Sequence, residues 1–164
     1  MGFLDFLGQK KETESPEEFW RRTAEKRGGE IKYYTFAIFL GRSKDSPCDL
    51  PGLLYMAGDT LWFEDFEKDA GWMRLFTPKS AYAKTEFGVP ASDIRWARPV
   101  SRKTAFACID GRMEPKAAPL ITPFAKVFFR SAVEIGLSDG GGLYFEVLKE
   151  KELLVLLAGA GSKK

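Results

Sequence analysis

The amino-acid sequence predicts a mainly β protein. Its antiparallel strands are expected to form bent sheets or a partly open barrel, with a C-terminal α-helix as a cap and an extra N-terminal helix. Short runs of aromatic and β-branched residues follow one another from Ile31 onward. Turn-forming glycines and aspartates separate these runs. One strongly apolar segment, Leu153 to Ala158, follows the last run and is suited to cover the open end of a curved sheet.

The chain divides into an N-terminal part, residues 1–30, with an amphipathic segment and a helix, and a β domain with its C-terminal helix, residues 31–164. The first eleven residues place apolar side chains beside Lys10 and Lys11, which is typical of a membrane anchor or a handle for a partner. The alternative is that this segment packs on the protein's own core. The residues expected to contact a membrane or partner are Phe3, Leu4, Phe6 and Leu7.

The first long helix is expected to begin after Ser15 and to end near Arg27. Ser15 can cap the helix, Pro16 suits its first turn, and Glu18 completes a capping box. The glycine pair that follows Arg27 is a typical helix end.

Four strands are expected in the next part of the chain. The first, Ile31–Leu40, is rich in aromatic and β-branched residues and is followed by a polar loop, Gly41–Pro51. Leu53–Met56 and Thr60–Glu64 flank a Gly-Asp pair, which predicts a tight hairpin. Trp72–Phe76 is expected to be a further strand.

The middle of the chain predicts more short strands and one long loop. Thr85–Pro90 and Ala91–Ala97 are expected to be strands joined by a short turn. Thr104–Ile109 is expected to be another strand. The following segment, Gly111–Pro123, carries three prolines and is expected to be a long loop.

The last third predicts a hairpin and a helix. Apolar residues recur at mostly two-residue spacing in Phe124–Leu137, which predicts a strand, and Leu143–Val147 returns after a glycine-rich turn. Lys149–Ala158 predicts a helix. Because this helix is apolar nearly all round after its first turn, we expect it to be buried.

Four motifs in this order carry a resemblance to a known family. They are Gly52–Met56 with Asp59–Phe63, Val89–Ile94, Val133–Gly140 with Leu143–Phe145, and Lys149–Leu157. Together they resemble the pleckstrin-homology superfold, in particular its bacterial and GRAM-like members, over residues 31–158. The resemblance implies a pleckstrin-homology-like fold. Eukaryotic members usually bind phosphoinositides through basic residues around the first hairpin, whereas the corresponding loop here, Arg42–Asp49, has balanced charge.

The composition excludes several kinds of chemistry. The chain has no histidine, so it lacks the usual general base of serine and cysteine hydrolases and the commonest metal ligand. Its two cysteines, Cys48 and Cys108, cannot build a Cys/His zinc site within one chain. We therefore expect no catalytic residues, no metal site and no cofactor.

A basic cluster is the candidate binding site that the sequence offers. Arg95, Arg98, Arg102 and Lys103 lie close together with Asp93 as the nearby opposite charge. Such a cluster can bind anionic headgroups or an acidic peptide, and the alternative is an ordinary exposed strand face. The net charge of +2 argues against a nucleic-acid partner.

These observations favour a non-enzymatic binding or scaffolding module that engages a protein partner or associates with itself as a homo-oligomer. One alternative is a peripheral membrane protein that binds lipid through its N-terminal segment. Another is a small-ligand binder or an enzyme whose pocket uses carboxylates and lysines. We expect a cytoplasmic protein, with peripheral contact at an anionic membrane left open, because no apolar run approaches the length of a membrane-spanning helix.

Overall fold

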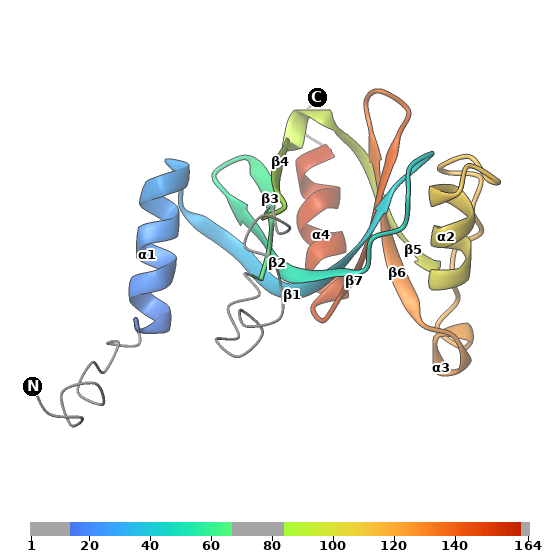
Figure 1. Cartoon of the computed structure of the whole chain (residues 1–164), viewed down its shortest axis with the longest axis horizontal. Helices are drawn as coiled ribbons and strands as arrows, with labels where there is room; N and C mark the ends of the chain where they lie inside the picture. Colours follow the sequence, from blue (N-terminus) through green and yellow to red (C-terminus); the bar gives the residue numbers. More distant parts are fainter. Residues whose placement is uncertain (1–13, 67–83, 162–164) are drawn as a thin grey trace, which may run out of the picture.

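A computed structural model describes residues 14–66 and 84–161 of the chain. Seven antiparallel strands form one sheet in the order β4-β3-β2-β1-β7-β6-β5. The sheet curves around the C-terminal helix and does not close into a barrel, and another helix precedes the first strand (Figure 1). The predicted class, mainly β with an N-terminal and a C-terminal helix, is therefore confirmed.

The strands and helices have the following bounds. The strands are β1 Ile31–Arg42, β2 Leu50–Ala57, β3 Thr60–Asp65, β4 Glu86–Pro90, β5 Ile94–Ser101, β6 Ser131–Leu137 and β7 Gly142–Val147. The helices are α1 Pro16–Arg27, α2 Arg102–Ile109, α3 Ala125–Phe128 and α4 Glu150–Gly161, with a short 3₁₀ turn η3 at Ala91–Asp93.

Local signals in the sequence explain α1 and the hairpins. The side chain of Ser15 accepts a hydrogen bond from the backbone of Glu18, and the Glu18 side chain accepts one from the backbone of Ser15, so the capping box forms as expected. Gly28 ends the helix in the left-handed conformation at φ 68°. Gly58 and Gly140 also have positive φ, and each lies in a predicted hairpin turn.

The main core fills the space between the inner face of the sheet and α4. Phe39, Phe63 and Phe145 contact one another there, with ring centroids 5.1–5.7 Å apart. Leu153 and Leu157 of α4 are buried in the same cluster. The expectation that this helix is buried is only partly correct, because Val155 is 75% exposed. The sheet covers one side of this helix, so its opposite side faces solvent.

A second core lies under α2, a segment for which the sequence predicts a strand. Thr104–Ile109 belongs to this helix. The side chain of Ser101 accepts a hydrogen bond from the Thr104 backbone at 3.1 Å, and this N-terminal cap favours a helix at this point of the chain. Ala105, Cys108 and Ile109 have helical spacing and are buried together against the sheet.

The expected strand Phe124–Leu137 is also only partly correct. Its first half forms α3, and β6 begins at Ser131. Thr122 favours the helical turn, since its hydroxyl accepts a hydrogen bond from the Ala125 backbone at 3.2 Å. The expected strand Trp72–Phe76 lies outside the described residues.

Candidate functional site

Both faces of the sheet carry aromatic side chains. The inner face packs against α4, and the outer face is the one that points away from α4. On β1, Tyr33, Thr35 and Ala37 are buried, whereas the alternating Tyr34 and Phe36 remain exposed. Because successive side chains of a strand point to opposite faces, β1 presents apolar surface on both sides. The outer side therefore needs a cover or a partner.

Helix α1 covers one end of this outer face. Trp20 lies on Tyr34 with ring centroids 4.4 Å apart and meets Tyr55 of β2 edge-on at 5.7 Å. Phe19 contacts Trp20 at 4.9 Å. Aromatic pairs in such arrangements stabilise contact beyond the area they bury. These rings make α1 a fixed wall beside the exposed part of β1.

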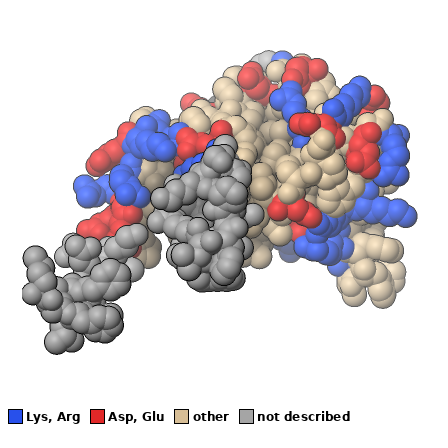
Figure 2. All heavy atoms as spheres, in the orientation of Figure 1, with Lys and Arg blue, Asp and Glu red and all other residues tan. Residues whose placement is uncertain are grey.

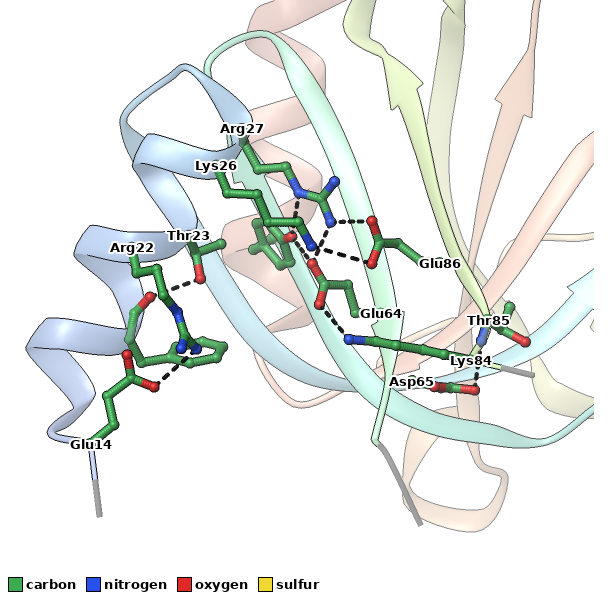
Figure 3. Close-up of polar contacts among 12 residues, drawn as sticks. Glu14, Arg22, Thr23, Lys26, Arg27, Glu64, Asp65, Lys84, Thr85 and Glu86 are labelled. Carbon is green, nitrogen blue, oxygen red and sulfur yellow. Dashed lines mark hydrogen bonds and ion pairs between the residues drawn. The ribbon is translucent and has the colours of Figure 1, made fainter. Parts of the chain in front are cut away.

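A polar cluster around Arg27 fastens the C-terminal end of α1 to the sheet (Figure 3). The Arg27 guanidinium donates hydrogen bonds to the Tyr55 hydroxyl at 3.0 Å, Glu64 at 2.5 Å and Glu86 at 2.6 Å. It also lies over the ring of Trp62 at 3.8 Å. One side chain therefore joins the helix to β2, β3 and β4.

The charges of this cluster stabilise one another. Burial opposes ionisation of Glu64, but hydrogen bonds from Tyr55, Arg27 and Lys84 outweigh it and lower the pKa of this carboxyl to about 2. Burial and the neighbouring Glu64 raise the pKa of Tyr55. Glu64 therefore stays charged, and Tyr55 stays neutral, across the physiological pH range. We interpret the cluster as the fastening of α1 and not as a reaction centre.

Beyond α1, the outer face is hollowed into a groove that we call the outer groove. It consists of two hollows with volumes of about 480 and 550 Å³, which share Phe36, Phe66 and Leu148 as lining residues. The first hollow reaches Phe19 and Trp20 of α1, and the second reaches Ile38 and Pro51. Phe36 is 58% exposed and Leu148 78% exposed. Large apolar side chains in such a continuous surface are typical of an interaction site.

The end of the outer groove farther from α1 is polar. Arg130 pairs with Glu146 at 2.5 Å, and Arg102 of α2 pairs with the other oxygen of Glu146 at 3.2 Å. Lys126 pairs with Glu150. The carboxylates of the groove are therefore matched with cations, and these ion pairs join α2 to β7 and α3 to the start of α4.

The four basic residues predicted as a binding cluster do not form one free surface. Arg102 also pairs with Asp49 at 2.7 Å, in addition to Glu146. Arg98 donates to Glu134 at 2.8 Å. Arg95 and Lys103 are exposed and have no ion pair among the described residues. Contacts within the fold thus engage two of the four, and the role of Arg95 and Lys103 in binding stays a prediction.

Glu134 is the centre of a buried polar network. It is fully buried and accepts hydrogen bonds from Trp96 at 2.9 Å, Arg98 at 2.8 Å and Tyr144 at 3.0 Å. Burial raises the pKa of the neighbouring Cys108 thiol. Because buried carboxylates require such partners, the network explains why Arg98 points into the fold.

The remaining observations concern the N-terminal residues, membranes, metals and the cysteines. The N-terminal contact residues Phe3, Leu4, Phe6 and Leu7 lie outside the described residues. In residues 14–66 and 84–161, no helix has the length and hydropathy to cross a membrane. Over the same residues, no three His, Cys, Asp or Glu side chains gather where they could hold a metal ion. Both cysteines are free thiols, one of them exposed and the other buried.

The outer groove is not among the sites predicted from the sequence, although the chain contains a signal for it. Ile31–Leu40 has large apolar residues at consecutive positions and does not alternate with polar ones. Such a strand has two apolar faces, and only one of them can face the main core. The contributions of Phe66 and Leu148 carry no such signal, because each lies just beyond the end of a strand.

Comparisons with known proteins give little further guidance. No family model matches the chain, and no curated protein matches it. Among solved structures, the chain is similar to the C-terminal domain of an unknown protein from Leishmania infantum, with 10% sequence identity and a TM-score of 0.49. This similarity covers 88% of the present chain and 95% of the other chain. A similarity of this degree assigns no function.

Proposed function

We propose that this protein is a non-enzymatic binding module of pleckstrin-homology-like fold that receives an apolar segment of a protein partner in the outer groove. The proposal rests on the two connected hollows of the groove, which share Phe36, Phe66 and Leu148 as lining residues. The linear strand order and the C-terminal helix that covers the inner face fit the family resemblance.

The chemistry of the groove favours a protein segment as its occupant. Its middle is apolar, and its far end presents Arg130 and Glu146, which can orient polar groups of a bound chain. The edge strand β4 is a poorer place for strand addition, because it has only five residues and ends at Pro90. The described carboxylates of the groove are engaged in ion pairs, which supports binding over acid–base chemistry.

A random-peptide display library selected on the full chain tests this proposal. We expect it to enrich peptides with aromatic and aliphatic residues. A Phe36→Ser, Leu148→Ser double variant should weaken their binding at least about tenfold, since two exposed apolar contacts are lost. The matched control is Val155→Ser, an equally exposed apolar residue on α4.

The outcomes separate a partner from self-association. Light scattering that shows an oligomer of the wild-type chain, and a monomer of the double variant, would identify a second copy as the occupant. Peptides that bind wild type and double variant equally would place the binding site elsewhere. A monomeric wild-type chain that enriches no peptide would overturn the proposal.

A further inference from the structure

A second apolar surface lies at α3 and belongs to no core. Phe124, Val127, Phe128 and Phe129, which we call the apolar tip, are each between 62% and 76% exposed. The rings of Phe124 and Phe128 contact each other edge-on at 5.3 Å. Single exposed apolar residues are common on protein surfaces, but four of them within residues 124–129 indicate a contact surface.

The apolar tip projects from the molecule. Figure 1 shows α3 at one end of the fold, below α2 and away from the curved sheet. In the space-filling view the same corner is an uncharged protrusion, with lysine and arginine side chains directly above it (Figure 2). A projecting apolar surface is suited to insert into a lipid interface, whereas a groove is suited to receive a peptide.

Part of the backbone of the tip is hydrogen-bonded internally. Thr122 accepts hydrogen bonds from the backbone of Ala125 and Lys126, at 3.2 Å and 3.1 Å. The backbone N–H of Phe129 donates to the carbonyl of Ala125 at 2.9 Å. Because unpaired backbone groups are costly in lipid, this closed turn can enter an apolar phase more easily than an open loop.

The charges behind the tip favour an anionic surface. Residues 115–133 contain lysine and arginine but neither aspartate nor glutamate. The Arg130 side chain is 64% exposed while that of its partner Glu146 is 12% exposed, and Lys126 is likewise more exposed than Glu150, at 32% against 16%. Lys103 is also exposed. The cations therefore face outward, where the headgroups of an approaching membrane would lie.

We propose that the apolar tip inserts into the interface of a membrane containing anionic lipids, with Lys103 and Arg130 at the level of the headgroups. Apart from Arg130, which also lines the polar end of the outer groove, this surface differs from the groove and from the N-terminal residues 3–7. The protein would then contact a membrane through α3 and keep the groove available for its partner.

The test uses sedimentation of the full chain with phosphatidylcholine vesicles that contain or lack phosphatidylserine. We expect binding to the mixed vesicles only, and weakening by salt. Phe124→Ser with Phe128→Ser should reduce the binding at least about tenfold, because the inserted area is lost. Lys103→Gln with Arg130→Gln should also reduce it, whereas Val155→Ser should leave it unchanged.

Hydrogen exchange of the wild-type chain gives a second reading that needs no variant. Mixed vesicles should slow exchange in residues 124–130. Absence of vesicle binding, equal binding to neutral vesicles, or unchanged binding by the Phe124, Phe128 variant would each overturn the proposal. It would also be overturned if substitution of Phe6 and Leu7 alone abolished binding, or if the tip variant instead dissolved an oligomer seen by light scattering.

Discussion

Arg27 is the residue on which the position of α1 depends most. Its side chain is only 7% exposed and faces two carboxylates, so its removal leaves Glu64 and Glu86 close together with only the more exposed Lys84 and Lys26 as counter-charges. We expect Arg27→Ala to lower the free energy of unfolding by about 3 kcal/mol, which is typical when one partner of a buried ion pair is removed. Urea denaturation measures this change.

The control for Arg27→Ala is Arg21→Ala on the same helix. Arg21 pairs with Glu25 at 3.6 Å, and both side chains are about two-thirds exposed or more, at 71% and 68%. We expect this substitution to cost about 0.3 kcal/mol or less. Equal effects of the two variants would show that the Arg27 cluster does not fasten α1.

Two glycines give a matched pair of substitutions with opposite expected signs. A Cβ at Gly136 would lie 1.9 Å from the indole of Trp96, so Gly136→Ala must displace the ring that donates to Glu134. We expect a loss of about 1–3 kcal/mol. Gly159 in α4 has open space around its Cβ position, and Gly159→Ala should stabilise by about 0.5 kcal/mol. Thermal melts of both variants check the signs, and a stable Gly136→Ala protein would contradict the close packing.

Among the elements, α1 is the one whose attachment should depend on pH. The pKa of Glu64 lies at about 2 in the fold, below its ordinary value of 4.5. A depressed carboxyl pKa contributes stability that is fully present above about 4.5 and is lost as the pH falls toward 2. We expect the Trp20 contact with Tyr34 to loosen in this range, which the difference in tryptophan fluorescence between the wild-type chain and a Trp20→Phe variant would record during acid titration. The Glu64→Gln protein should lose much of this transition.

The elements also show which features can be read from sequence. Helix α1 is predicted well, since its cap, first-turn proline and terminal glycine are all local signals. Helices α2 and α3 are not, because each is short and its apolar residues fit two-residue spacing as well as helical spacing. Ser101 and Thr122, whose hydroxyls accept backbone hydrogen bonds, are the signals that would have corrected both.

At the scale of the whole molecule, the site depends on how the sheet curves. The sequence indicates apolar residues on both faces of β1 but not which face meets α4, so Phe36 could not be assigned to a groove. That Arg98 of the predicted basic cluster has a partner within the fold could not be read from the sequence for a related reason. Glu134 lies far from Arg98 in the sequence, yet the antiparallel pairing of β5 with β6 places them opposite each other. Contacts of this kind follow from register, which one sequence does not specify.

The whole-molecule prediction concerns the closing helix. Leu153 is fully buried with the aromatic cluster of the sheet, whereas Val155 on the same helix is 75% exposed. If α4 completes the main core, Leu153→Ala should lower the free energy of unfolding by about 3 kcal/mol. Val155→Ala should change it by less than about 0.5 kcal/mol. Because α4 contacts β5 and the sheet curves around it, far-UV dichroism and tryptophan fluorescence should report one coincident urea transition in wild type. Similar small effects of both substitutions would show that α4 is an appendage, and the inner face of the sheet would then be a second apolar surface open to a partner.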